Sequence, residues 1–377
     1  MKMVDLNGQY RRLKSEMDAA VEKVMASGTY IKGEEVTEFQ ENLSRFLSVP
    51  HVIGCGSGTD ALQIALMALG LQPGDEVITT PFTFIATAEV MALLRVKPVF
   101  VDVEENTFNL DIHQINAAIT PRTKAILPVH LYGQSANMDP LLQIAEKHGL
   151  YVVEDACQSI GAEYIFADGQ RKMTGTMGTF GCTSFFPTKN LGCYGDGGAM
   201  FTHDAELAKL AACIANHGAE IKYHHERVGV NSRLDTLQAA ILNVKLRHLG
   251  EFTQARQSAA DRYDTLFADC DWLTVPYRAS YSTHVFHQYT VRLADRVNRD
   301  QLQELLRAEG VPTMVYYPVP LHLQPVFAEL GYRRGDFPVA EHLADTVLSL
   351  PMHTELTAQE QEKVREVMGR VVEKCWK

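Results

Sequence analysis

Two hydrophobic patterns alternate between residues 50 and 205. Short, continuously apolar runs rich in β-branched residues are typical of strands covered on both faces of a sheet. The segments between them place apolar residues at helical spacing and often end in glycine. The predicted strands are HVIGC (51–55), EVITT (76–80), KPVFVDV (97–103), KAILPVHL (124–131), YVVEDA (151–156), CTSFF (182–186) and GGAMFTHD (197–204). This order predicts an α/β fold with a mostly parallel central sheet wrapped by helices.

The pattern changes in the last third of the chain. Residues 234–249 place apolar residues on one helical face, which predicts a long helix that bridges to the C-terminal residues. Beyond it come a helix, a strand at 287–293 and another helix at 299–310. We therefore expect a large α/β domain with the N-terminal segment over 1–249 and a small C-terminal α+β domain over 250–377.

The charge balance narrows the classes of partner. The 377 residues include 35 Lys and Arg against 46 Asp and Glu, a net charge of −11. Nucleic acids and anionic membranes need a basic face, so neither is expected as a partner. No apolar run approaches the length of a membrane span, and the first residues lack the apolar core of a signal peptide. A cytoplasmic enzyme is the expectation.

Cysteines and histidines do not have the spacing of a metal site. The seven cysteines are scattered and never form a C-x-x-C pair, which suits reduced thiols. No H-x-x-x-H or H-E-x-x-H pattern occurs. We expect no metal.

Lys189 stands directly after an apolar run and at the start of a glycine-rich turn, in SFFPTKNLGCYGDGGAM (184–200). A lysine held in apolar surroundings loses its proton more easily and becomes a nucleophile. The alternative is that Lys189 begins a surface turn and extends its ammonium into water, the more common arrangement for an isolated lysine after a strand.

A second glycine-rich turn, IGCGSGTDAL (53–62), leads from a predicted strand into a helix that begins at Thr59 or Asp60. Small residues let backbone N–H groups approach a phosphate, and the helix N-terminus adds a favourable dipole. The turn matches neither a dinucleotide-binding motif nor a Walker motif. Taken alone, such a turn more often reflects tight packing.

Two further strand ends carry candidate residues. Asp155 ends an apolar strand, where sites in parallel α/β sheets gather. It is either the N-cap of a short turn or a carboxylate that keeps a ring nitrogen protonated, with Gln158 bonding the same ligand. Phe84 is placed to stack on a flat ring, although core packing is the ordinary explanation for an isolated phenylalanine.

The order of these features favours one cofactor. A phosphate turn, a stacking aromatic residue, a strand-end Asp and a strand-following Lys occur in succession. Pyridoxal 5'-phosphate (PLP) chemistry needs a lysine for the aldehyde, an acid beside the ring nitrogen and donors for the phosphate. The sequence therefore predicts a PLP enzyme.

Nearly the whole chain resembles the DegT/DnrJ-type sugar-nucleotide aminotransferases, PLP enzymes of the aspartate aminotransferase fold (fold type I). The segments that carry the resemblance are DLNGQY, GTYIKGEEVTEFQ, SGTDALQIALMALGLQPGDEVITTPFTFIATA, VHLYGQSANMD, VEDACQSIGA, SFFPTKNLGCYGDGGA, YPVPLH and LSLPMH.

The resemblance implies a role for each candidate residue. Lys189 would hold the cofactor as a Schiff base and carry the proton, Asp155 would pair with the ring nitrogen and Gln158 with the ring hydroxyl, and Phe84 would stack on the ring. The phosphate ligands would be Gly58, Thr59 and Ser184, joined by Asn231 from a second subunit. The working unit would then be a homodimer with shared active sites.

Within the family, the chain is most similar to the branch that aminates UDP-2-acetamido-2-deoxy-3-keto-glucuronic acid with glutamate, for bacterial surface polysaccharide (O-antigen). Arg233 offers a planar fork for the C6 carboxylate, although a structural ion pair is the alternative. The other implied sugar-nucleotide contacts are Gly28, Tyr30, Thr188, Tyr316 and Tyr317. Tyr316 departs from the histidine that this branch tends to carry, which leaves a dTDP- or UDP-linked 3- or 4-keto-6-deoxy sugar as the alternative substrate.

Two other classes of protein share this fold. A PLP-dependent sugar dehydratase resembles the family but carries histidine at the lysine position, so Lys189 argues against it. A non-catalytic regulator is disfavoured by the intact set of Asp155, Ser184, Lys189 and Asn231.

Overall fold

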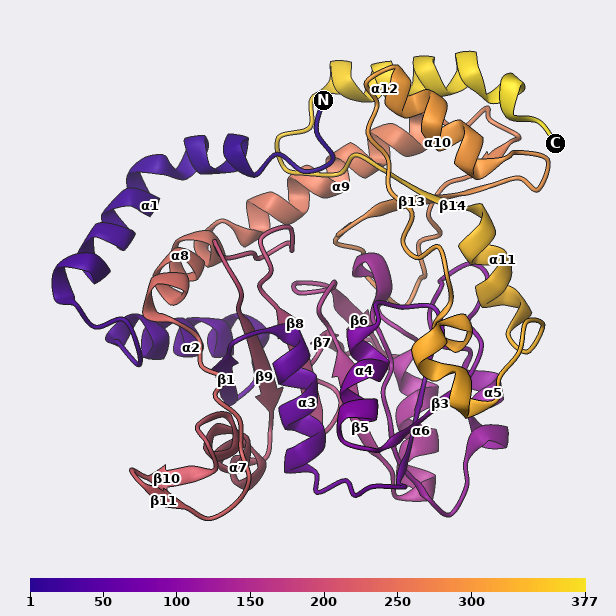
Figure 1. Cartoon of the computed structure of the whole chain (residues 1–377). Helices are drawn as coiled ribbons and strands as arrows, with labels where there is room; N and C mark the ends of the chain where they lie inside the picture. Colours follow the sequence, from indigo (N-terminus) through magenta and orange to yellow (C-terminus); the bar gives the residue numbers. More distant parts are fainter.

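The computed structural model describes the whole chain, Met1–Lys377, and is built around a seven-stranded sheet (Figure 1). The strand order is β1-β9-β8-β5-β4-β2-β3. The strands are β1 (His51–Cys55), β2 (Glu76–Thr79), β3 (Lys97–Phe100), β4 (Thr123–Ile126), β5 (Tyr151–Asp155), β8 (Phe180–Ser184) and β9 (Gly198–Thr202). Only β9 runs antiparallel to its neighbours β1 and β8. The predicted mostly parallel sheet is confirmed.

Apolar helices cover this sheet. Two of them, α3 and α7, are packed against each other and against the strands. The helices that follow strands are α3 (Gly58–Ala68), α4 (Ala86–Leu93), α5 (Ile112–Ala118), α6 (Met138–His148) and α7 (Ala205–Ala215). In α3 the side chains of Ala61, Leu62, Ile64 and Leu66 are buried on several sides, because the helix lies between the sheet and its neighbours. The N-terminus of α3 is thereby held rigidly at the end of β1.

The N-terminal helices pack against a helix from the last third of the chain. α1 (Leu6–Ser27) and α2 (Glu34–Leu47) both contact α8 (Thr236–Arg247), which contains most of the predicted 234–249 helix. After α8 the chain continues as α9 (Leu249–Leu266), which carries it toward the C-terminal part (Figure 1). The N-terminus also reaches that part, because the carbonyl of Met3 accepts a hydrogen bond from the N–H of Met352, 3.3 Å apart.

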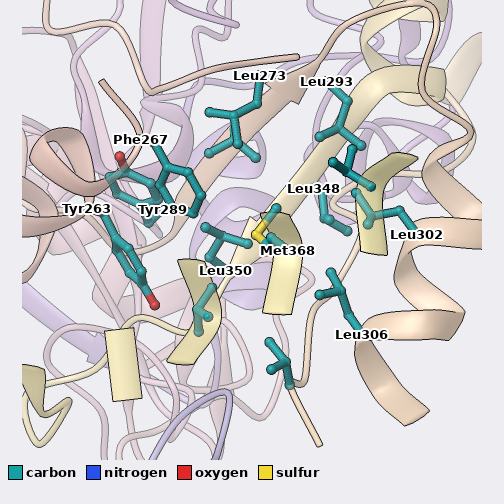
Figure 2. Packing of buried hydrophobic residues seen from close by; sticks show 14 of the residues in the cluster. Tyr263, Phe267, Leu273, Tyr289, Leu293, Leu302, Leu306, Leu348, Leu350 and Met368 are labelled. Carbon is teal, nitrogen blue, oxygen red and sulfur yellow. The ribbon is translucent and has the colours of Figure 1, made fainter. Parts of the chain in front are cut away.

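The C-terminal part has an apolar core of its own, shown in Figure 2. A three-stranded antiparallel sheet of β12 (Leu273–Thr274), β13 (Tyr289–Leu293) and β14 (Val347–Leu350) lies at its centre. Helices α9, α10 (Arg299–Ala308) and α12 (Ala358–Val371) contribute further side chains. The strand predicted at 287–293 and the helix predicted at 299–310 are thus present. A domain boundary at 249/250 stays a prediction.

The remaining elements are short. They are β6 (Glu163–Ile165), β7 (Arg171–Met173), β10 (Ala219–Ile221), β11 (His224–His225), α11 (Pro338–Thr346) and four single-turn or short 3-10 helices at Leu131–Gly133, Leu321–Leu323, Pro325–Leu330 and Val372–Cys375. No helix combines the length and the apolar composition needed to cross a membrane.

Candidate active site

A cavity of about 600 Å³ opens where β5 and β8 end. The α3 N-terminus and the loop before α4 form one side, and residues from the C-terminal part form another. Most of the predicted site residues line it. They are Gly58, Thr59, Phe84, Asp155, Gln158, Ser184, Thr188, Lys189, Tyr316 and Tyr317. The cavity thus joins segments that are far apart in the sequence.

Lys189 lines this cavity instead of extending into bulk water. Its side chain is half-buried, and its backbone N–H donates to the carbonyl of Phe186 at 2.8 Å, which closes the turn after β8. Burial lowers the pKa of Lys189 below its ordinary value, against the smaller opposing effects of Cys157 and Asp155. More of this amine is therefore neutral, and available to accept a proton, than in a surface lysine.

Asp155 is buried at the end of β5, with one hydrogen-bond donor on each carboxylate oxygen. Oδ1 accepts from the N–H of Cys157 at 3.2 Å, and Oδ2 accepts from the hydroxyl of Thr87 at 2.8 Å. No helix starts here, but the bond from the Cys157 N–H caps the turn that follows β5, so one carboxylate oxygen serves that turn. The same carboxylate also lines the cavity.

The glycine turn after β1 leaves two backbone donors without a partner. Ser57 caps α3 by accepting from the N–H of Asp60 at 3.0 Å, whereas the N–H groups of Gly58 and Thr59 have no acceptor within the chain. A Cβ added to Gly58 would lie 2.7 Å from Cβ of Ser184, so the turn and the end of β8 meet closely. Unpaired N–H groups at a helix N-terminus beside a hydroxyl suit a phosphate.

Aromatic side chains form another part of the wall. Phe84 is 54% exposed and is not a core residue; its ring centroid lies 6.2 Å from that of Tyr317. The amide of Gln158 donates to the Tyr317 hydroxyl at 3.1 Å and accepts from the backbone N–H of Tyr132 at 2.8 Å. The hydroxyl of Tyr132 in turn donates to the carbonyl of Tyr316. These bonds hold the aromatic side of the cavity in one arrangement.

Sequence reasoning missed several residues of the cavity. They are Ser57, Leu62, Thr83, Ala86, Cys157, Phe186, Asp196, His287 and Gln288. Most of them lie inside or next to the glycine turns and strand ends that hold the predicted residues. Their closeness in sequence to those motifs could therefore have indicated that they line the cavity. His287 and Gln288 begin the segment predicted as a strand, and nothing local marks them as cavity residues. Burial, together with the nearby charges of Lys189 and Arg256, holds the pKa of His287 well below its ordinary value.

Four predicted site residues lie outside this cavity. Gly28, Tyr30, Asn231 and Arg233 lie instead on two segments joined to each other, and we call them the outer patch. The carbonyl of Tyr30 accepts from the N–H of Thr236 at 2.9 Å, which ties the two segments together. Tyr30 is 46% exposed, and Arg233 forms no ion pair or side-chain hydrogen bond within the chain.

Comparison with known proteins identifies the family. The model of the DegT/DnrJ/EryC1/StrS aminotransferase family matches residues 11–369. The chain belongs to this family. It is 50% identical, over 97% of its length and 96% of the relative's, to a pleiotropic regulatory protein of Geobacillus stearothermophilus. It is also 50% identical, over 94% of its length and 95% of the relative's, to the UDP-2-acetamido-2-deoxy-3-oxo-D-glucuronate aminotransferase of Pseudomonas aeruginosa.

A solved structure of the family shows the same fold. S. venezuelae DesV, in complex with ketimine intermediate, superposes with a TM-score of 0.94 at 40% sequence identity, covering 99% of this chain and 98% of that one. The chain is therefore a PLP-dependent transferase of fold type I, as predicted. It is a transaminase that acts on nucleotide-linked sugars.

The residues present fit PLP as its cofactor. The unpaired N–H groups of Gly58 and Thr59 suit the phosphate, the buried Asp155 carboxylate suits a protonated ring nitrogen, and Lys189 supplies an amine of lowered pKa. The exposed ring of Phe84 offers a flat apolar surface at the cavity.

Proposed function

We propose that this enzyme transfers an amino group from glutamate to UDP-2-acetamido-2-deoxy-3-keto-glucuronic acid, in the cytoplasm, during the synthesis of bacterial surface polysaccharide such as O-antigen. The observation that carries the choice of a uronate is the unpaired guanidinium of Arg233. The likeness to the P. aeruginosa aminotransferase supports the same substrate.

Arg233 has the chemistry to recognise the C6 carboxylate. The structural alternative, an ion pair that fixes the start of α8, requires an acidic partner, and none binds Arg233 within the chain. A guanidinium presents parallel N–H groups that match a carboxylate, and such charge-assisted pairs are stronger than neutral hydrogen bonds. A substrate carboxylate would give this arginine its partner.

The outer patch would act in the active site of a second copy. Between Asn231 and Arg233, the buried hydroxyl of Ser232 accepts from the N–H of Gly56 at 2.8 Å and donates to Asp60 Oδ2 at 2.7 Å. This anchors the patch behind the chain's own phosphate turn, while Asn231 remains exposed. In a homodimer, Asn231 would reach the partner's phosphate site, and Gly28, Tyr30 and Arg233 would reach the partner's sugar nucleotide.

Each residue of the cavity would have one task. The N–H groups of Gly58 and Thr59 and the hydroxyl of Ser184 bind the phosphate. Asp155 holds a proton at the ring nitrogen, and Gln158 bonds the ring hydroxyl. Phe84 covers the ring face, while Thr188, Tyr316 and Tyr317 position the sugar nucleotide.

Lys189 would move the proton in both halves of the reaction. Its neutral Nζ would take the proton from the α-carbon of glutamate, the amino group would stay on the cofactor, and water would supply the keto oxygen of the 2-oxoglutarate that leaves. In the second half the same amine delivers a proton to C3 of the sugar, where the new amine is formed. PLP, when bound, supplies the electron sink that makes these carbon-bound protons acidic.

A deoxysugar is the second candidate substrate. Tyr316 departs from the histidine that the resemblance to the uronate branch implies. The chain is also 42% identical over 93% of its length to a dTDP-3-amino-3,4,6-trideoxy-alpha-D-glucose transaminase of Streptomyces venezuelae. A dTDP- or UDP-linked 3- or 4-keto-6-deoxy sugar has no C6 carboxylate, so it would leave Arg233 without a partner.

Offering the candidate substrates one at a time tests the proposal. Glutamate first converts the holoenzyme to the form that carries the amino group, and 2-oxoglutarate is removed. UDP-3-keto-uronic acid and 4-keto-6-deoxysugar nucleotides are then added in separate single-turnover reactions. Rapid return of the PLP absorption with the uronate is the expected result. Turnover of only the deoxysugars would reject the uronate and keep the transaminase.

A mixed-dimer experiment tests the shared site. Homodimers of Lys189→Ala and of Arg233→Ala should each aminate the uronate poorly. Random mixed dimers combine one intact Lys189 with one intact Arg233 in a single site, so about a quarter of the wild-type activity should return. No recovery would show that each chain builds its own site.

A further inference from the structure

Two threonine hydroxyls connect the cavity wall to Asp155. Thr87 Oγ1 lies 2.8 Å from Asp155 Oδ2, and Thr83 Oγ1 lies 3.2 Å from Thr87 Oγ1. Thr83 lines the cavity, whereas Thr87 is fully buried behind it. Neither threonine was among the residues that the sequence singled out.

The direction of these hydrogen bonds follows from the number of hydrogens. An ionised carboxylate can only accept, and a threonine hydroxyl has a single hydrogen to donate. Thr87 therefore donates to Asp155, and its oxygen accepts from Thr83. Because Thr83 cannot donate elsewhere at the same time, the two hydroxyls form one oriented chain that ends on the carboxylate.

Sheet topology explains why this contact depends on tertiary structure. Thr83 lies in the loop after β2, and Thr87 lies in the first turn of α4. β4 stands between β2 and β5 in the sheet, so the start of α4 must reach past β4 to meet the end of β5. The fold places α4 where its first turn can touch Asp155.

The Thr87 hydroxyl is the sole donor to Asp155 Oδ2 within the chain, as the Cys157 N–H is to Oδ1. Hydrogen bonds to a carboxylate favour its charged form and restrict its rotation. We propose that Thr87, supported by Thr83, is a positioning residue that holds the Asp155 carboxylate correctly oriented for the ring nitrogen of the cofactor. This inference rests on the proposed pairing of Asp155 with that nitrogen.

An analogue that lacks the ring nitrogen separates this role from a structural one. Apoenzyme is prepared from wild type and from Thr87→Val, and its dissociation constants for PLP and for 1-deaza-PLP are measured by titration. The Val side chain keeps the shape of Thr and removes the hydroxyl. The wild type should bind PLP more tightly than 1-deaza-PLP. Thr87→Val should reduce the ratio of the two dissociation constants by about tenfold, the factor expected for the loss of one hydrogen bond to a charged group.

Thr79→Val is the matched control. Thr79 is also fully buried, and its hydroxyl donates to the carbonyl of Leu127 at 2.8 Å, away from the cavity. Its loss should change stability but leave the preference for PLP over 1-deaza-PLP unchanged. Thr87→Ser, which restores the hydroxyl, should recover the wild-type preference, and Thr83→Val should reduce it less than Thr87→Val does.

Different outcomes reject different claims. A wild type that binds the two compounds equally would reject the pairing of Asp155 with the ring nitrogen, and the role of Thr87 with it. A wild-type preference that Thr87→Val leaves unchanged would reject the role of Thr87 alone. If Thr87→Val does not fold, an unchanged preference in Thr83→Val would overturn the proposed chain of hydroxyls.

Discussion

The cavity and the outer patch differ in how their polar groups are held. In the cavity, Asp155, Gln158 and Tyr317 are tied into hydrogen bonds by their own chain. On the outer patch, Asn231 is exposed and Arg233 has no partner within the chain. Asp155 and Gln158, proposed to act on the cofactor ring, are held in advance, whereas Arg233, proposed to recognise the sugar, has no partner until a ligand binds. Chemistry and substrate choice should therefore be separable by mutation.

Removing Lys189 should have the largest effect. Lys189→Ala loses the amine that moves the proton, so both half-reactions should slow by about 10⁴-fold. Single-turnover absorption measurements with glutamate and with the keto-sugar check this. Lys189→Arg, which keeps the charge but not a neutral amine, is the control and should be similarly slow. A large loss in one half-reaction only would contradict a shared proton carrier.

Removing Arg233 should separate the two half-reactions. Arg233→Ala should lower kcat/KM for the keto-uronate by about 100-fold, because a charge-assisted pair is lost, and leave the glutamate half-reaction close to wild type. For Arg233→Lys, kcat/KM for the keto-uronate should lie between the values of the wild type and Arg233→Ala, since lysine keeps the charge without the planar fork. Equal losses in both halves would place Arg233 in a structural role.

A buried histidine should make folding depend on pH. Burial, with a smaller effect of the Arg278 charge, lowers the pKa of His284 to about 3. Between pH 6.5 and 3 the unfolded chain therefore binds a proton that the folded chain excludes, so stability falls as the pH falls. The contribution is about 1.4 kcal/mol per pH unit.

Denaturant unfolding of the holoenzyme at about pH 7, 6 and 5 measures this dependence. His284→Asn keeps an acceptor near the N–H of Phe286, which now donates to His284 Nδ1 at 3.0 Å, and it does not titrate. Its stability should therefore fall less steeply on acidification. Parallel curves for the two proteins would show that His284 does not contribute.

The smallest effect should come from the outer patch in the isolated chain. Asn231→Ala should change the free energy of unfolding of the chain by less than about 0.5 kcal/mol, since its side chain is exposed. Asn243→Ala is the matched control, because the buried Asn243 amide donates to the carbonyl of Glu35 at 3.0 Å and should cost about 1–3 kcal/mol. A large loss for Asn231→Ala would mean that the patch supports the fold.

Local patterns predicted much of the fold and the centre of the site. Continuous apolar runs indicated the strands, and the order of Gly58, Phe84, Asp155 and Lys189 indicated PLP. Such features are local, because a strand's burial and a helix N-terminus are determined mainly by neighbouring residues. The antiparallel direction of β9 was not predicted, since an apolar run carries no information about the direction of its partner.

By itself, the sequence determined the class of fold, the family and the residues with the most distinctive chemistry. Only the tertiary structure decided that Lys189 faces a cavity, that Phe84 is exposed within it and that Thr87 holds Asp155. It also separated the outer patch from the cavity of its own chain. The physical reason is that burial, hydrogen-bond partners and lowered pKa values arise from contacts between segments far apart in the sequence, which local hydrophobic patterns do not encode.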